Sequence, residues 1–245
     1  MELAKKGMSI LLVSRTPAKL KATQESILEK TKGKVEVTTL AVDFSDFNAE
    51  KQALVKAEVA KMTEDGGVGV LVNNVGISYS FCRYFHELTM DEANAMVEMN
   101  VNSTSRMTHI VLGNDDVGML SRKRGAIVNM SSAAARNPSP LLAQYSGTKG
   151  YIEHFSGSMN SELKSKGIHV QSQTPLFVRS KLEAGLGRIR KPTLTTPSPK
   201  DFAKASVSSL TRPRTHILMH NLTHAFTRPA SPPCPHPSSP KSPPL

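Results

Sequence analysis

The chain has 245 residues, of which 38% are hydrophobic and 5% aromatic, and it contains no tryptophan. This length allows one domain with a substantial core built on aliphatic side chains. The two cysteines, Cys82 and Cys234, exclude a disulfide framework and a cysteine-rich zinc site, and they favour a reducing compartment.

The net charge of +11 is weighted toward the C-terminal end. Residues 202–245 contain no acidic residue and five basic ones, which leaves +6 for the rest of the chain. That excess suits a protein whose ligand carries phosphate groups. A basic nucleic-acid-binding module is a minor alternative, because the charges lack interleaved aromatic residues. We therefore expect no nucleic-acid partner.

No apolar run approaches the 18 residues of a membrane span. The opening "MELAKKGMSILLV" also lacks a signal-peptide cleavage region. The sequence is therefore expected to behave as a soluble chain.

The first half of the chain predicts three strands and two helices. The strands are expected at 8–15, 35–44 and 68–74, and the helices at 18–30 and 48–62. Thr16 is the expected N-cap of the first helix, and Pro17 its first residue.

The second half continues the alternation. A capping box formed by Thr89 and Glu92 opens a helix, and strands are expected at 125–132 and 168–173 around a helix at 143–166. Nearly continuous apolar strands separated by helices indicate a parallel sheet covered on both faces. The fold class is therefore doubly wound, Rossmann-like α/β.

A different composition begins near residue 188, so we divide the chain into a domain at 1–187 and an atypical C-terminal segment at 188–245. Residues 228–245 include eight prolines in eighteen positions. Disorder or a polyproline-type extension is expected there, because proline cannot donate backbone hydrogen bonds, and we expect disorder in the segment 188–245 as a whole. The tail is either a ligand for a proline-recognising module or an unselected extension, for example from a shifted reading frame.

Ligands of doubly wound sheets bind beyond the carboxyl ends of the strands, so polar residues at those ends are candidates. Arg15 can pair with an adenosine 2′-phosphate, which favours NADP over NAD, or it is an ordinary exposed arginine. Asp43 suits the edge of an adenine ring, or it caps a helix. In "NNVG", Asn73 can tie strand ends together and Gly76 permits a close approach of a ligand; the alternative is a simple turn.

Four further residues stand out farther along the chain. Asn100 is a poor helix former inside an expected helix, and Ser132 ends the strand "IVNMSS", where it is alternatively an N-cap or turn residue. Tyr145 and Lys149 lie one helical turn apart, and a cation there favours the phenolate, which makes the tyrosine a usable proton donor. Alone this spacing is weak evidence, since composition gives roughly 0.3 such pairs by chance.

In this order, "NNVG" (73–76), Asn100, Ser132, "YSGTK" (145–149) and "PLFVRSKL" (175–182) resemble the motifs of the short-chain dehydrogenase/reductase family. The similarity covers roughly residues 1–185. Within the family the chain is most similar to the branch of very-long-chain 3-oxoacyl-CoA reductases and 17-beta-hydroxysteroid dehydrogenase type 12.

The resemblance implies NADPH-dependent reduction of a ketone, either a 3-oxoacyl-CoA of fatty acid elongation or a steroid-like substrate. It implies that Tyr145 donates the proton, that Lys149 lowers the pKa of the tyrosine and binds the nicotinamide ribose, and that Ser132 holds the carbonyl oxygen. Asn100 would support a water-linked proton path. The implied cofactor-binding residues are Arg15, Asp43, Asn73, Gly76, Tyr145, Lys149, Pro175 and Val178. The resemblance also implies the endoplasmic reticulum and allows a homo-oligomer.

One family motif is not found. The glycine-rich turn T-G-x-x-x-G-x-G, which receives the pyrophosphate, has no counterpart, and "MELAKKG" resembles the end of the helix that follows it. We therefore expect an N-terminally truncated sheet that lacks a central strand and leaves unpaired edges along an apolar channel. The alternative to an enzyme is a non-catalytic fragment or pseudoenzyme that cannot bind the dinucleotide.

Overall fold

The computed structural model describes residues 1–62, 67–113, 118–176, 178, 197–210 and 216–217. Its strands are β1 (Ile10–Ser14), β2 (Val37–Ala41), β3 (Val70–Asn73), β4 (Gly125–Met130), β5 (Ile168–Gln173) and β6 (His216–Ile217). Its longer helices are α1 (Pro17–Thr31), α2 (Ala49–Lys61), α3 (Met90–Val97), α4 (Ser103–Leu112), α6 (Ala143–Leu163) and α8 (Pro199–Ser209). Short helices are η1 (Ala4–Lys6), η2 (Phe44–Asp46), η3 (Phe85–Glu87), the π-helix η4 (Glu98–Asn102), α5 (Met119–Arg122), η5 (Ala133–Ala135) and η6 (Lys164–Lys166).

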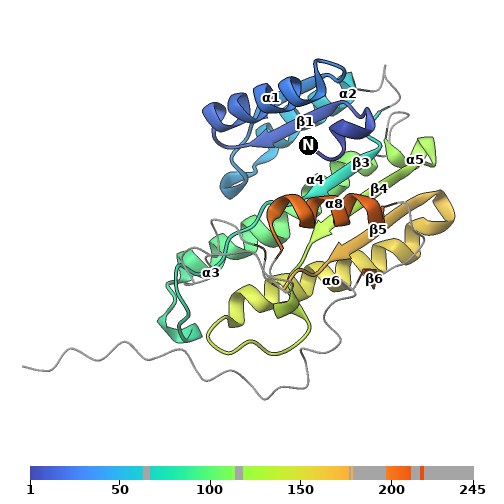
Figure 1. Cartoon of the computed structure of the whole chain (residues 1–245). Coiled ribbons are helices and arrows are strands. Elements are labelled where there is room, and N and C mark those ends of the chain that lie inside the picture. Colours follow the sequence, from blue (N-terminus) through green and yellow to red (C-terminus); the bar gives the residue numbers. More distant parts are fainter. Residues whose placement is uncertain (63–66, 114–117, 177, 179–196, 211–215, 218–245) are drawn as a thin grey trace, which may run out of the picture.

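The strands form two parallel sheets. One sheet has the order β1-β2, and the other has the order β3-β4-β5-β6. Figure 1 shows the arrows of β1, β3, β4 and β5 pointing the same way, so the carboxyl ends of both sheets lie on one side of the molecule. The predicted α/β class with parallel strands is confirmed.

The helix starts follow the capping chemistry of the sequence. Thr89 and Glu92 form the predicted capping box, in which the Glu92 amide donates to the Thr89 hydroxyl and the Thr89 amide donates to the Glu92 carboxylate. Pro17 is the first residue of α1 and Thr16 its N-cap, but the Thr16 side chain makes no capping hydrogen bond.

One hydrophobic core joins the two sheets. Phe44, Phe47 and Val55, which follow β2, are buried in the same cluster as Leu71 on β3 and Ile127 on β4. Across this boundary α2 packs against α4. The two sheets are therefore held in one body, although β1 and β3 are not hydrogen-bonded to one another.

The segment 188–245 contains more structure than expected. Helix α8 begins at the N-cap Ser198, whose hydroxyl accepts from the Asp201 amide at 3.2 Å, with Pro199 as the first helical residue. This capping signal is readable in the sequence, but no helix was predicted there. The short strand β6 pairs with β5. The proline-rich tail at 228–245 lies outside the described residues.

Among the helices that the structure describes, none is both long and apolar enough to cross a membrane.

Candidate active site

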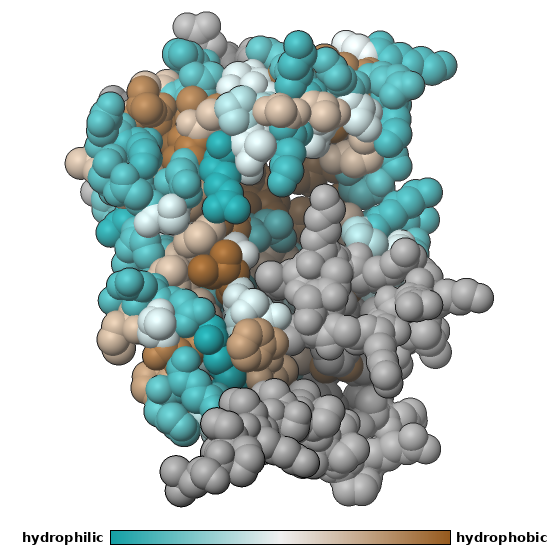
Figure 2. All heavy atoms as spheres, turned by 90° about the vertical axis from the view of Figure 1, so that its left-hand side faces the viewer, coloured by the Kyte–Doolittle hydropathy of each residue, from teal (hydrophilic) through white to brown (hydrophobic). Residues whose placement is uncertain are grey.

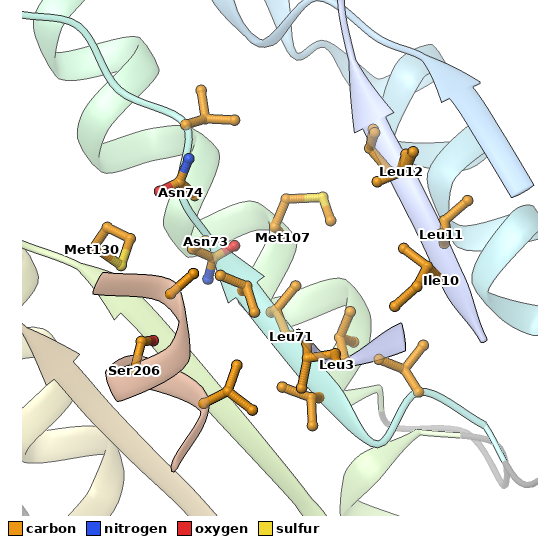
Figure 3. Close-up of a pocket in the computed structure, with 18 of the residues that line it drawn as sticks. Leu3, Ile10, Leu11, Leu12, Leu71, Asn73, Asn74, Met107, Met130 and Ser206 are labelled. Atoms are coloured by element: carbon orange, nitrogen blue, oxygen red, sulfur yellow. The ribbon is translucent and has the colours of Figure 1, made fainter. Parts of the chain in front are cut away.

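The site lies in a cavity between the two sheets. Within the described residues β1 pairs only with β2, and β3 only with β4, as the sequence predicted for an interrupted sheet. The cavity between them has a volume of about 1630 Å³. Figure 3 shows Ile10, Leu11 and Leu12 of β1 facing it from one side, with Leu71 and Asn73 of β3 on the other.

The cavity reaches the carboxyl ends of the strands, where several candidate residues meet. Of the predicted site residues, those that line it are Asn73, Gly76, Ser132, Tyr145, Lys149, Pro175 and Val178. The strand arrows of Figure 1 point to the side that faces the viewer in Figure 2, where a recess with hydrophobic side chains at its floor is visible. The structure therefore gathers residues from β3 to the segment after β5 around one cavity.

Lys149 is the buried cation of the site. Its side chain is only 6% exposed, and burial lowers its pKa to about 8. The ammonium donates to the carbonyl of Met130 at 2.9 Å and lies 5.8 Å from the centre of the Tyr145 ring. A cation with three donors thus stands beside the phenol, and the bond to Met130 uses one of them.

Asn100 holds the backbone close to Lys149 and is not among the residues that line the cavity. It is 1% exposed, and its Nδ2 donates to the carbonyl of Ile77 at 3.0 Å and to Oγ1 of Thr148 at 2.9 Å. Its Oδ1 accepts from the Ile77 amide at 2.8 Å. Asn100 lies within the π-helix η4, a turn wider than that of an α-helix. Its side chain makes hydrogen bonds to Ile77 and Thr148, which belong to other segments of the chain. Asparagine is unfavourable inside a helix, and these hydrogen bonds explain its presence here. Asn100 connects the loop that follows β3 to helix α6.

Gly76 lies close to both of these residues. A methyl group at this position would come within 3.1 Å of Asn100 Oδ1 and 3.2 Å of Lys149 Nζ. A side chain at residue 76 would therefore crowd these polar groups, and glycine leaves room for the backbone after β3 to approach them.

Hydrogen bonds hold the end of β4 against α6 and β5. The hydroxyl of Ser131 donates to the carbonyl of Lys149 at 2.8 Å, and that of Ser146 donates to the carbonyl of Ala134 at 2.7 Å. The Ala133 amide donates to the carbonyl of Pro175 at 2.9 Å. Ser132 lies between these ties and caps η5, since its hydroxyl accepts from the Ala134 amide. The N-cap alternative for Ser132 is therefore observed, and the residue also lines the cavity.

Asn73 ties the strand ends together. Its Nδ2 donates to Oγ1 of Thr108 at 3.0 Å and to Oδ1 of Asn129 at 2.8 Å, and Asn129 donates to the hydroxyl of Ser156 at 2.9 Å. These side chains are all buried. Both donors of Asn73 thus serve a buried network that joins β3, β4, α4 and α6, the structural role that the sequence offered for this residue.

Arg15 and Asp43 stand apart from the other candidates. Neither is among the residues that line the cavity. Asp43 caps η2, accepting from the amide and the hydroxyl of Ser45, and these bonds lower the pKa of its carboxyl. Arg15 is exposed at the end of β1, near enough to contribute to that lowered pKa. The capping alternative for Asp43 is therefore present in the structure.

Sequence reasoning missed several residues that hold the site in place: Thr148, Ser131, Asn129 and Ser156. Thr148 lies directly before Lys149, and Ser131 directly before Ser132, so adjacency to a candidate was the available signal. Asn129 and Ser156 gave none, because their roles depend on contacts between strand and helix that spacing does not specify.

Comparisons with known proteins agree with this geometry. The family model described as short chain dehydrogenase matches residues 1–189. The chain is 42% identical over 214 residues to very-long-chain 3-oxoacyl-CoA reductase of Rattus norvegicus, covering 85% of this chain and 62% of that protein. It is 36% identical over 209 residues to the inactive hydroxysteroid dehydrogenase-like protein 1 of Homo sapiens, covering 85% and 60%.

Solved structures show the same fold. A short-chain dehydrogenase from Sphingobium yanoikuyae in complex with NADPH superposes with a TM-score of 0.71 at 23% identity, covering 84% of this chain and 76% of that one. A 3-oxoacyl-[acyl-carrier protein] reductase with bound NAD from Brucella melitensis gives 0.67 at 25% identity, covering 85% and 76%.

The chain spans about 62% of the length of the reductases it matches. The family model matches residues 1–189, a range that includes the candidate residues at the strand ends. It also includes Tyr145 and Lys149, which lie on α6. The chain therefore belongs to the short-chain dehydrogenase/reductase family, in the branch of the very-long-chain 3-oxoacyl-CoA reductases and hydroxysteroid dehydrogenase-like proteins.

Proposed function

We propose that this site reduces a ketone to an alcohol, with Tyr145 as the proton donor. The observation that carries the proposal is the buried Lys149 ammonium beside the Tyr145 ring, on the wall of a cavity at the carboxyl ends of the strands. From the relatives we infer a 3-oxoacyl-CoA substrate, with a steroid-like ketone as the other choice.

Tyr145 gives its phenolic proton to the oxygen of the ketone as that oxygen gains negative charge. The Lys149 ammonium makes this transfer easier, because a nearby cation stabilises the phenolate that remains. At neutral pH Lys149 is largely protonated, since its pKa of about 8 lies above 7. Lys149 therefore carries its positive charge at neutral pH.

Ser132 and Asn100 support this proton donor. The Ser132 hydroxyl on the cavity wall donates to the substrate oxygen and so helps to stabilise the developing charge. Asn100 holds the loop after β3 and Thr148, and thereby positions the Lys149 segment of α6. Asn100 thus acts on the proton path from outside the cavity.

A nicotinamide cofactor would supply the hydride in this reaction. The described residues fit one end of such a cofactor. The Lys149 ammonium has three donors, which suit ribose hydroxyls, and Gly76, Pro175 and Val178 line the same cavity. They do not fit the pyrophosphate, because no long helix in the described ranges opens on a glycine-rich turn. NADP rather than NAD is our choice from the exposed Arg15 alone.

A second candidate function is that of a non-catalytic member of the family. The poor fit to a pyrophosphate favours it, and one similar human protein carries the word inactive in its name. Calorimetric titration with NADPH separates the two. A dissociation constant below about 100 μM, equivalent to roughly 5.5 kcal/mol, would argue against the non-catalytic alternative.

Product formation tests the proposal. We expect the purified chain with NADPH and a long-chain 3-oxoacyl-CoA to yield the 3-hydroxyacyl-CoA, detected by mass spectrometry. A folded sample that binds NADPH and yields no alcohol from either substrate class would refute it. The endoplasmic reticulum and a homo-oligomer, both implied by the branch, stay predictions.

A further inference from the structure

The proposed proton donor lies in the first turn of α6, where a helix is held least by its own hydrogen bonds. α6 begins at Ala143, so Tyr145 is its third residue. The first amides of an α-helix have no carbonyl partner within the helix, and helix ends open more easily than their middles. A general acid must meet the substrate oxygen at hydrogen-bond distance, and a displacement of about 1 Å can cost up to about 10²-fold in rate. Contacts from outside the helix are therefore needed to fix this turn.

The N-cap residue of α6 does not supply such a contact. This residue is Leu142, whose side chain has no acceptor and makes no capping hydrogen bond. Serine, threonine, asparagine and aspartate are preferred at N-caps, because their side-chain oxygen accepts from the second or third amide of the helix. In α6 the second amide, that of Gln144, instead donates to the hydroxyl oxygen of Tyr79 at 3.0 Å. Tyr79 therefore caps α6 from a position 65 residues earlier in the chain.

The loop after β3 that carries Tyr79 is itself fixed. Tyr79 is only 4% exposed, and two residues before it Asn100 holds both backbone groups of Ile77. The same loop meets the entry to α6 a second time, since the Arg83 amide donates to the carbonyl of Leu141 at 3.2 Å. Leu141 has a backbone φ of 66°, which is uncommon for residues other than glycine and persists where the surroundings impose it. The loop after β3 thus holds both the entry to α6 and its first turn.

The neighbours of Tyr145 along the chain are also bonded to other segments. Nε2 of Gln144 donates to the carbonyl of Ala93 on α3 at 3.1 Å, and the hydroxyl of Ser146 donates to the carbonyl of Ala134 at 2.7 Å. The backbone that carries the phenol is therefore positioned by residues on each side of it. The Tyr79 contact can be deleted by removing one oxygen atom, which leaves the buried ring in place.

We propose that Tyr79 is a positioning residue for the site. Its hydroxyl fixes the first turn of α6 relative to the loop after β3, and this holds the Tyr145 phenol at the cavity. The catalytic consequence rests on the proposed function. Tyr79 is not among the residues that line the cavity, so it acts through Gln144 rather than on the substrate. A merely structural cap could be replaced by any other cap, whereas a positioning contact also sets where the turn lies.

Amide hydrogen exchange tests the contact without any turnover. In Tyr79→Phe the Gln144 amide loses its acceptor, so its exchange should be accelerated at least about tenfold more than that of Ile152 in the middle of α6. A general loss of stability would accelerate both amides alike. The Ser146 amide keeps its acceptor, the carbonyl of Leu142, and should still be accelerated about threefold more than Ile152, because the turn opens more often. Acceleration of Ser146 that only equals that of Ile152 would overturn the proposal.

Turnover measures the consequence for the proposed reaction. With NADPH and a long-chain 3-oxoacyl-CoA, Tyr79→Phe should lower kcat by about tenfold and change KM and the dissociation constant of NADPH by less than about twofold. The stoichiometry of NADPH binding corrects kcat for the folded fraction. Tyr151→Phe is the matched control, because it also removes a phenolic hydroxyl in a hydrogen bond, here 3.0 Å from Ser105 Oγ, and lies outside the first turn of α6. It should leave kcat unchanged.

A local cap separates positioning from helix stability. Leu142→Ser places a hydroxyl at the N-cap of α6, where it can accept from the Gln144 amide in place of the Tyr79 oxygen. In the Tyr79→Phe background this second substitution should slow the exchange of Gln144 again and leave kcat low. Return of kcat to the natural value would overturn the proposal, because any cap would then suffice.

The positioning role and the proposed function fail in different ways. A natural chain that binds NADPH and reduces neither substrate class refutes the proposed function, and the exchange experiment still decides whether Tyr79 holds the turn. An active natural chain with unchanged kcat in Tyr79→Phe overturns the positioning role alone. A Tyr79→Phe variant in which only KM rises would overturn it as well, since Tyr79 would then shape substrate binding.

Discussion

Replacing Lys149 by methionine should make the protein more stable at neutral pH. The side chain is 6% exposed, and burial lowers its pKa from 10.5 to about 8. A buried ammonium with a depressed pKa destabilises the folded state wherever the group is still protonated. Methionine has a similar length and carries no charge, so Lys149→Met removes this penalty.

The magnitude follows from the pKa. A shift from 10.5 to about 8 corresponds to about 3 kcal/mol, at 1.36 kcal/mol per unit. The variant also loses the hydrogen bond to the carbonyl of Met130, which costs about 1 kcal/mol. We therefore expect Lys149→Met to be more stable than the natural chain by about 2 kcal/mol at pH 6.5.

The pH dependence supplies the sign check. The folded state releases the Lys149 proton near pH 8 and the unfolded state near pH 10.5, so the penalty is complete below 8 and disappears above 10.5. The advantage of the variant should therefore shrink between these two values. Urea denaturation of both proteins at pH 6.5 and 9.5 measures it. A variant that is less stable at pH 6.5, or an advantage that is equal at both pH values, would refute the reasoning.

Three further predictions concern the same wall. Gly76→Ala should destabilise the protein by about 1–3 kcal/mol and weaken NADPH binding, since its methyl group meets Lys149 Nζ. The control Gly147→Ala, at a position on α6 with open space around it, should instead stabilise the protein by about 0.5–1 kcal/mol. Thermal melts compare the two variants. Asn73→Ala should lower the free energy of unfolding by about 2–3 kcal/mol in urea denaturation, because it leaves the buried partners Thr108 and Asn129 unpaired. Asn74→Ala, at an exposed position, should change that free energy by less than about 0.5 kcal/mol. Equal effects of the two substitutions would contradict the buried network. Turnover should fall as pH rises through about 8, where Lys149 loses its charge, and a profile that is flat to pH 9.5 would exclude that role.

The strands and helices were predictable because each carries its own local signal. β5 occupies the range read from the sequence, and the Thr89–Glu92 capping box forms as expected. The interruption between β1 and β3 within the described residues was also predicted, because no glycine-rich turn of the family was found in the sequence. Helix α8 was overlooked because its capping signal lies within a segment of otherwise atypical composition.

The site was only partly predictable, for a physical reason. The order of the family-like motifs, rather than residue type or spacing alone, made Tyr145, Lys149 and Ser132 candidates, and in the structure these residues line one cavity. The same reasoning left the role of Asn73 open, and its hydrogen bonds inside the protein follow from the packing of β3 against α4. The depressed pKa of Lys149 depends on burial by distant segments, which spacing along a helix does not report.

The most direct test of the proposed function compares the NADPH-dependent reduction of a 3-oxoacyl-CoA by the natural chain and by Tyr145→Phe. Loss of a general acid should lower kcat by about 10²–10⁴-fold, while thermal melting stays close to that of the natural chain. Turnover in the Tyr145→Phe variant that equals that of the natural chain would contradict the account, because the proton would then come from another group.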